Sequence, residues 1–325
     1  MFCEMTPPIG VSIRRLTPER WMMGSSTICE RVMTPNPANA IVSWEDGDDT
    51  FRLRERAEGE ILSLGDGSET GLVHEGGTSA AVWSIGANAF CKVKAWHKGM
   101  ELESKTIAFI RENAPEIPVP EVIYTWIDHE WNRTFLILRR IRGQTLDNEW
   151  SRLAPNQRLQ IASKIVEYCR KLASISSCRF ESAAGRAVVE PFLHSMADVS
   201  HPSWIPRPIG PFSSTALAFH LSAVAPECDL DVGSLFYFYH ADLGPTNIIV
   251  LDSTVVGILD WESAAYYPKF WIATKARLSA GFYLQNDRTD RKAWSCILGQ
   301  MLEANGFPQN VDGYYKWRRQ NAFCR

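Results

Sequence analysis

The chain has 325 residues, of which 45% are hydrophobic, enough for a large core or two adjoining lobes. Its 34 basic and 37 acidic residues give a formal net charge of −3 without a long run of either sign, which argues against a nucleic-acid partner. No segment approaches about 18 consecutive apolar residues, and the N-terminus lacks the apolar core of a signal peptide. We therefore expect a cytoplasmic protein without a membrane partner. The 8 cysteines include no C-x-x-C pair, which favours reduced thiols.

Residues 1–70 give the weakest signals, and we treat them as an N-terminal extension of unassigned function. Within them, Thr17-Pro18-Glu19 is typical of a helix start, with Thr as the N-cap and Pro at the first helical position.

Residues 71–142 change in texture and predict a small antiparallel sheet with one helix. Short β-rich runs separated by glycine or turn residues indicate strands at 72–75, 81–85, 89–94, 119–126 and 134–141. The helix is expected over 101–113, where apolar residues recur at helical spacing and Pro115 follows. This segment is the smaller of two expected lobes, and the family resemblance described below implies that it binds the nucleotide.

Residues 143–325 predict a larger, mostly helical lobe. Apolar residues from Leu159 to Leu172 follow three- and four-residue steps, and a second helical stripe runs over 294–302. Two strand-like runs, 247–251 and 255–259, flank a predicted hairpin turn at Asp252-Ser253-Thr254. The expected fold class is therefore α+β, with a β-hairpin inside the helical lobe.

The run from His240 to Asn247 carries the chemistry. Phosphoryl transfer needs an oriented acceptor hydroxyl and cations that neutralise phosphate charge. Asp242 is suited to deprotonate the hydroxyl, and Asn247, five positions on, to hold a metal ion. Asp260 follows the second hairpin strand, so we expect it to face Asn247 across one metal site. His240 has no metal-ligand partner nearby, and we predict that its imidazole bonds backbone groups and anchors the loop.

The pattern H-x-D-x-x-x-x-N followed by D-W-E resembles the aminoglycoside phosphotransferase-like branch of the protein-kinase-like fold, over about residues 70–300. Gly210-Pro211-Phe212 and the run 267–271 resemble fungal members in particular. The resemblance implies a two-lobed fold with ATP or GTP and Mg²⁺ as cofactors. It also assigns roles to other residues: phosphate binding by Lys92 with Glu103 as its ion-pair partner, a phosphate loop at Gly77, Thr78 and Ser79, and adenine binding by backbone groups near Arg139 and Ile141.

Several positions leave alternatives open. Lys94 lies on the same strand face as Lys92 and could replace it as the phosphate lysine. Glu262 is either a metal ligand or a charge at a helix start. The loop at Gly77 lacks G-x-G-x-x-G, and Ala241 replaces a glycine common in the family.

The sequence thus predicts a phosphotransferase that moves the γ-phosphate of ATP or GTP to a hydroxyl of a small metabolite or natural product. One alternative is an inactive kinase-like module that binds a nucleotide or a protein. Another is a biosynthetic enzyme that phosphorylates an intermediate to activate it for elimination or cyclisation. The identity of the acceptor is not readable from the chain, because fold and motif do not determine substrate.

Overall fold

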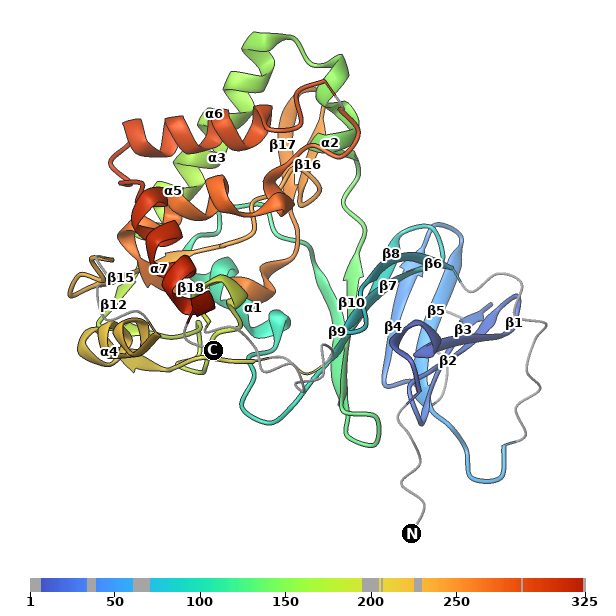
Figure 1. Ribbon diagram of the computed structural model, residues 1–325. Helices are drawn as coiled ribbons and strands as arrows, with labels where there is room; N and C mark the ends of the chain where they lie inside the picture. Colours follow the sequence, from blue (N-terminus) through green and yellow to red (C-terminus); the bar gives the residue numbers. More distant parts are fainter. Residues whose placement is uncertain are drawn as a thin grey trace. The chain divides into compact units, whose positions relative to one another are not determined.

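The computed structural model describes residues 7–33, 39–60, 71–194, 205, 207–224, 230–287 and 289–323. The chain divides into two compact units, which we describe separately. The N-terminal unit comprises residues 1–98, 121–140 and 200–206, and the C-terminal unit comprises 99–120, 141–199 and 207–325. In Figure 1 the strands of the first are blue to green, and the helices of the second are mostly green to red.

The N-terminal unit contains two five-stranded antiparallel sheets. The first has the order β1-β2-β3-β5-β4 and consists of β1 (Ile13–Thr17), β2 (Arg20–Met23), β3 (Thr27–Val32), β4 (Val42–Asp46) and β5 (Asp49–Glu55). The second has the order β6-β7-β8-β10-β9 and consists of β6 (Leu72–Gly76), β7 (Ala80–Ile85), β8 (Ala89–Ala95), β9 (Val122–Asp128) and β10 (Arg133–Arg139). A short 3-10 helix, η1 (Ile9–Val11), precedes β1. The second sheet is the one that the sequence predicts.

The predicted helix start at Thr17 is wrong. Thr17 ends β1, and Thr17 pairs with Arg20 across a tight turn that leads into β2. The Thr17 hydroxyl accepts a hydrogen bond from the backbone N–H of Glu19 at 3.3 Å. Thr-Pro favours both helix starts and tight turns. Pairing with the neighbouring strand selects the turn, and this pairing depends on tertiary structure.

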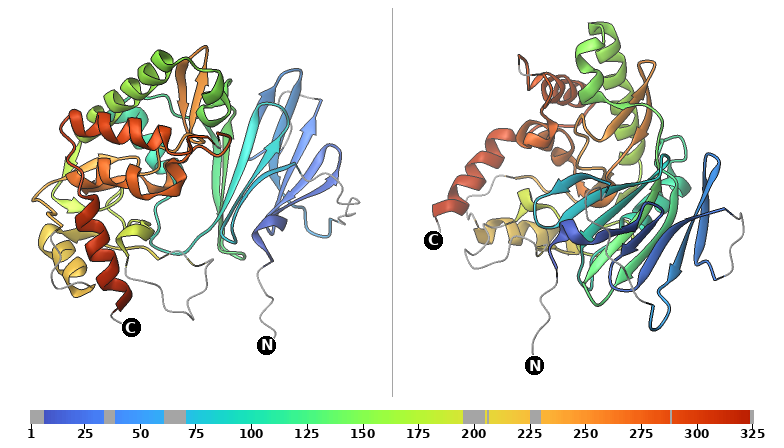
Figure 2. Two further views of the ribbon diagram at one scale, coloured as in Figure 1. Left: turned by 45° about the horizontal axis from the view of Figure 1, so that its top comes forward. Right: turned by 90° about the vertical axis from the view of Figure 1, so that its right-hand side faces the viewer.

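The two sheets of the N-terminal unit share one hydrophobic core. Figure 2 shows the two sheets as two layers. Strand residues alternate between the core and the opposite face, because successive side chains of a strand point to opposite sides. The aromatic side chains that fill the core are buried and come from both sheets: Trp21, Trp44, Phe51, Trp83 and Phe135.

The C-terminal unit consists of helices and short sheets, which confirms the predicted α+β class. Its helices are α1 (Glu103–Asn113), α2 (Leu146–Glu149), α3 (Pro155–Ala173), α4 (Ser214–Val224), α5 (Lys269–Leu278), α6 (Ala293–Ala304) and α7 (Val311–Phe323). Its 3-10 helices are η2 (Trp150–Arg152), η3 (Pro191–Leu193), η4 (Trp261–Ser263) and η5 (Ala280–Phe282). Among the residues that the structure describes, no helix combines the length and the apolar character needed to cross a membrane.

Among the described residues, the strands of the C-terminal unit form three small sheets. They are β11 (Gln144–Thr145) with β16 (Ile248–Leu251) and β17 (Thr254–Ile258); β12 (Ser176–Ser177) with β15 (Phe236–Tyr239) and β18 (Ala265–Pro268); and β13 (Arg179–Phe180) with β14 (Phe212–Ser213). The predicted hairpin is β16–β17. Asp252 and Ser253 turn it with φ values of 48° and 61°, as a two-residue turn with both central residues left-handed requires.

Candidate active site

The loop from His240 to Asn247 joins β15 to β16, and His240 ties its start to the end of β17. The imidazole is fully buried, and its Nδ1 accepts a hydrogen bond from the backbone N–H of Asp242 at 3.1 Å. Its Nε2 therefore carries the proton and donates to the carbonyl oxygen of Leu259 at 2.9 Å. The ring of Trp261 meets the imidazole edge to face, with centroids 4.5 Å apart. These are the backbone contacts that a loop anchor needs.

The middle of this loop is held by close packing. The indole N–H of Trp294 donates to the carbonyl oxygen of Leu243 at 2.9 Å. The backbone N–H of Asp147 donates to the carbonyl oxygen of Pro245 at 3.1 Å. A Cβ added at Gly244 would lie 2.2 Å from the carbonyl oxygen of Gly281. Only glycine therefore fits at this position.

Asp242 and Asn247 are brought together by the loop. The Asn247 carboxamide donates to the Asp242 carbonyl oxygen at 2.9 Å and to Asp242 Oδ2 at 3.1 Å. Both side chains are half-buried. With its Nδ2 facing Asp242, Asn247 has its carbonyl oxygen left to offer a metal ion.

Burial raises the pKa of the Asp242 carboxyl above its ordinary value. The positive charge of Lys275 opposes this rise, whereas the negative charges of Glu262 and Glu190 add to it, and the hydrogen bond from Asn247 opposes it. A carboxylate with a raised pKa is a stronger base, so the environment suits proton abstraction.

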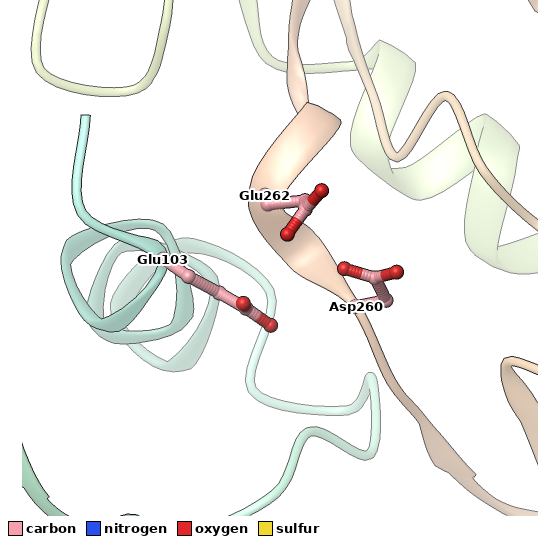
Figure 3. Close-up of side chains that lie close together, drawn as sticks. All are labelled: Glu103, Asp260 and Glu262. Atoms are coloured by element: carbon pink, nitrogen blue, oxygen red, sulfur yellow. The ribbon is translucent and has the colours of Figure 1, made fainter. Parts of the chain in front are cut away.

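Three carboxylates gather where α1 meets η4. Oxygen atoms of Glu103, Asp260 and Glu262 lie within 4.8 Å of one another, and all three residues are half-buried (Figure 3). Glu103 opens α1, whereas Asp260 immediately precedes η4 and Glu262 lies within it. The Glu103 carboxylate also accepts a hydrogen bond from the backbone N–H of Trp261 at 3.1 Å. Carboxylates this close repel one another, and an oxygen-rich set of this kind suits a hard divalent cation.

The two predicted metal ligands, Asn247 and Asp260, thus make their contacts with different residues. Asp260 lies with Glu103 and Glu262, whereas Asn247 bonds Asp242. Asn247 and Asp260 flank the same end of the β16–β17 hairpin, because the backbone N–H of Leu259 donates to the Asn247 carbonyl oxygen at 2.8 Å. Asp260 adopts a left-handed backbone with φ of 65°, which redirects the chain into η4.

The predicted phosphate-binding residues lie in the N-terminal unit. Lys92 and Lys94 alternate on β8 with the buried Cys91 and Val93, so both project from the face opposite the core, as predicted. Lys92 and Glu103 belong to different units. Their ion pair stays a prediction.

The other predicted nucleotide-binding residues are the turn between β6 and β7, the last residue of β10 and Ile141, which follows two positions later. Gly77, Thr78 and Ser79 form the turn between β6 and β7, with Gly77 at φ of 61°. Arg139 ends β10, and its guanidinium binds Glu121 at 2.8 Å. Ile141 is half-buried in the C-terminal unit.

A buried ion pair beside Asp242 was missed by the sequence reasoning. Lys275 of α5 lies 2.5 Å from the carboxylate of Glu190, which is fully buried and also accepts from the Trp271 indole at 3.3 Å. The stretch before Glu190 has no clear pattern. A lysine inside the apolar run of α5 was the one signal that could have pointed to it.

The chain belongs to the phosphotransferase enzyme family, whose sequence model matches residues 72–269. This confirms the predicted resemblance to the family, whereas the finer resemblance to fungal members stays a prediction. No curated protein matches the chain.

Several solved aminoglycoside phosphotransferases resemble the structure. A type VIII aminoglycoside-3′-phosphotransferase has a TM-score of 0.44 and 17% identity, and the match covers 77% of this chain and 92% of that one. A ternary complex of a thermostable APH(4)-Ia mutant with AMP-PNP and hygromycin B has a TM-score of 0.43 and 16% identity, covering 77% and 91%. A GDP and kanamycin complex of an APH(2″) enzyme has a TM-score of 0.41 and 12% identity, covering 77% and 80%.

Proposed function

We propose that the protein transfers the γ-phosphate of ATP or GTP, with Mg²⁺, to a hydroxyl group of a small molecule. The observation that carries this proposal is the contact between Asp242 and Asn247. In a member of a phosphotransferase family, it joins a base and an amide ligand at the H-x-D-x-x-x-x-N spacing.

Asp242 is the proposed general base. Its half-buried carboxylate would accept the proton of the acceptor hydroxyl as the oxygen attacks the γ-phosphorus. Asn247 would hold one carboxylate oxygen through its Nδ2–H, which orients the other oxygen toward the acceptor. His240 would position Asp242 without taking part in proton transfer, because it accepts a hydrogen bond from the Asp242 backbone and does not contact the carboxylate.

The oxygen ligands near η4 fit Mg²⁺, which prefers carboxylates and amides and keeps several waters. When bound, Mg²⁺ would neutralise the phosphate charge. Asp260 and Asn247 are the proposed ligands, and Glu262 is a further candidate. Glu103 is another candidate ligand, because its carboxylate oxygen lies within 4.8 Å of those of Asp260 and Glu262. Its predicted pairing with Lys92, the proposed phosphate lysine, is a separate proposal.

The test replaces Asp242 by Ala in the full chain. We expect turnover to fall by about three orders of magnitude or more, as for loss of an essential base. The thermal shift caused by nucleotide and Mg²⁺ should persist, because Asp242 is not a proposed nucleotide contact. Candidate hydroxylated metabolites are screened by mass spectrometry for a gain of one phosphate.

The matched control is Asp290→Ala, an exposed aspartate outside the site. Undiminished product formation by the Asp242 variant would remove the base assignment. Absence of any nucleotide-induced shift in the wild-type chain would favour a non-catalytic module. Release of phosphate together with a dehydrated or cyclised product would identify the activating type of enzyme.

A further inference from the structure

The two sheets of the N-terminal unit have the same construction. In each, all neighbouring strands are antiparallel, and the fifth strand in sequence lies between the third and the fourth. The orders β1-β2-β3-β5-β4 and β6-β7-β8-β10-β9 are therefore identical. The first sheet comes from a stretch to which the sequence analysis assigned no function.

The strand register repeats residue by residue. Trp21 pairs with Cys29 between β2 and β3, and Trp83 pairs with Cys91 between β7 and β8. Both tryptophans and both cysteines are 62 positions apart (83 − 21 and 91 − 29). The same step relates all four residue pairs of the first hairpin to pairs of the second. The equivalence is thus defined by hydrogen-bonded pairing and by side-chain identity together.

The remaining strands follow the same rule. Trp44 pairs with Phe51 and stacks on it, with centroids 5.6 Å apart and planes at 15°. Trp126 pairs with Phe135 and stacks on it at 4.7 Å and 12°. Identical residues occupy the following equivalent positions: Trp21 and Trp83, Gly24 and Gly86, Cys29 and Cys91, Trp44 and Trp126, Asp46 and Asp128, Thr50 and Thr134, Phe51 and Phe135.

The sheets also contact each other reciprocally. Asp46 at the end of β4 accepts a hydrogen bond from the backbone N–H of Ala87 at 2.7 Å, in the turn between β7 and β8. Asp128 at the end of β9 accepts one from the backbone N–H of Ser25 at 2.6 Å, in the turn between β2 and β3. Asp46 is equivalent to Asp128, and Ser25 is equivalent to Ala87. Each contact therefore occurs twice with its partners exchanged.

Close approach at two glycines repeats the same relation. A Cβ at Gly86 would lie 1.9 Å from Asp46 Oδ2 and 2.9 Å from the Phe51 ring. A Cβ at Gly24 would lie 2.3 Å from Asp128 Oδ2 and 3.1 Å from the ring of Phe135. Each contact between the two sheets is therefore repeated with the roles of the sheets exchanged. This is the pattern of an isologous interface, which has local two-fold symmetry.

The copies differ on the face opposite the core. The position of Lys92 is held by Glu30 in the first sheet, and the positions of the apolar Val82, Leu136 and Leu138 are held by arginines. Those arginines all form ion pairs with Glu30, at distances of 2.6 to 3.2 Å: Arg20, Arg52 and Arg54. Arg20 and Arg54 also bind Glu60.

The connection that contains the helix of Glu103 in the second copy is much shorter in the first copy. Between β3 and β4 lie only residues 33–41, whereas residues 96–121, which include α1, separate β8 from β9. Two elements assigned to nucleotide binding in the second copy, the lysine and the helical glutamate, thus have no counterpart in the first.

We propose that residues 13–55 are a second copy of the sheet β6–β10, that the copies pair as the halves of a dimer do, and that the first copy does not bind nucleotide. On its charged face, three arginines are joined by ion pairs to Glu30 and Glu60. Its core face covers Trp83, Cys91 and Phe135, which are fully buried. The first copy serves as a built-in partner subunit. For the binding role of the second copy, the proposal rests on the proposed function.

The pairing is tested by hydrogen exchange in the full chain, measured by mass spectrometry without nucleotide. Asp46→Ala and Asp128→Ala remove the acceptors of equivalent contacts from opposite copies. We expect each to raise exchange about tenfold or more in peptides of both sheets, because loss of buried hydrogen bonds destabilises the shared unit. Asp49→Ala, at an exposed ion pair with Arg31, is the control and should change little.

Asn88→Ala provides a milder variant in case an aspartate variant does not fold, since it removes only the hydrogen bond of 2.5 Å from the Asn88 carboxamide to Asp46. It should affect both sheets in the same direction. Faster exchange confined to the sheet that carries the substitution would overturn the pairing. A response of one aspartate variant without a response of the other would also overturn it.

The binding arm counts nucleotides by calorimetry with AMP-PNP and Mg²⁺. We expect one per chain, lost in Lys92→Ala and unchanged in Glu30→Gln. Two nucleotides per chain, or an equal loss in both variants, would overturn the non-binding assignment. A wild-type chain that binds no nucleotide would contradict the proposed function, and the exchange experiment would still judge the pairing of the copies.

Discussion

The Nδ2 group of Asn247 donates two hydrogen bonds to Asp242, one to its backbone carbonyl oxygen at 2.9 Å and one to its carboxylate at 3.1 Å. The residue predicted as a metal ligand is therefore also the residue that orients the proposed base. In Asn247→Ala both contacts disappear, and we expect turnover to fall about a hundredfold, because small misplacements of reacting groups have effects of this size. The measurement is the steady-state rate against Mg²⁺ concentration. If saturating Mg²⁺ restored the full rate, Asn247 would serve the metal alone.

The charge on Lys275 should influence the pH dependence of catalysis. The base must be ionised, so activity falls as pH drops through the pKa of Asp242, which burial raises above the ordinary aspartate value. The charged groups that act on Asp242 are Lys275, Glu262 and Glu190, and only Lys275 favours ionisation by its charge. Removing it should therefore move the acidic limb of kcat/KM to higher pH.

The suitable variant for this experiment is the double substitution Lys275→Met with Glu190→Gln. Replacing Lys275 alone would leave Glu190 buried without its partner, at a cost of about 3–5 kcal/mol. Lys269→Met, on the exposed start of α5, is the matched control. Glu190→Gln also removes a negative charge that raises the pKa of Asp242, so the double variant reports the difference between two opposite effects, of which that of Lys275 is the larger. An acidic limb that stays at the same pH or moves to lower pH would show that the charge of Lys275 does not outweigh that of Glu190 at the base.

Substitution at Gly244 should disrupt the loop through its backbone contact. A methyl group there would lie 2.2 Å from the Gly281 carbonyl oxygen, and neither backbone can yield without moving the loop. We expect Gly244→Ala to lower the free energy of unfolding by about 1–3 kcal/mol and to reduce activity. Gly281→Ala is the comparison, because its Cβ would meet its nearest atoms at 3.3 and 3.4 Å. Urea unfolding should show a clearly smaller loss for it, and equal losses would contradict the packing argument.

The cluster of Glu103, Asp260 and Glu262 should respond to Mg²⁺ before any substrate binds. Cation binding to the folded state alone raises Tm by mass action, so Mg²⁺ should stabilise the wild-type chain and EDTA should reverse the effect. Each Glu-to-Gln or Asp-to-Asn variant should weaken the response, with apparent Mg²⁺ affinity falling about tenfold or more. Glu112→Gln, exposed on the same helix as Glu103, is the control. An unchanged response in Glu103→Gln would restrict that residue to its contact with the Trp261 backbone.

Much of the site follows from local sequence. The spacing of His240, Asp242 and Asn247 predicts a loop, and the turn at Asp252 and Ser253 predicts the hairpin that follows it. Alternation along β8 predicts that Lys92 and Lys94 share a face. These inferences depend on periodicity and turn chemistry, which act over a few residues.

The incorrect prediction of a helix start at Thr17 arose where local sequence does not decide the structure. The residues there satisfy a cap and a turn equally well, and β1 and β2 become strands because they pair with each other and bury Met23 and Trp21 against the second sheet. The same dependence hid the first sheet altogether, since its repeat becomes visible only when the hydrogen-bonded register aligns Trp21 with Trp83.

The sequence by itself determined the proposed catalytic run from His240 to Asn247, the hairpin that follows it and the α+β class, because each depends on contacts between near neighbours. Tertiary structure alone decided which charges meet. Glu103 joins Asp260 across 157 positions (260 − 103), and Glu190 joins Lys275 across 85. A carboxylate is attractive or repulsive only according to what packs beside it. That neighbourhood is created when α1, α5 and η4 fold into one unit.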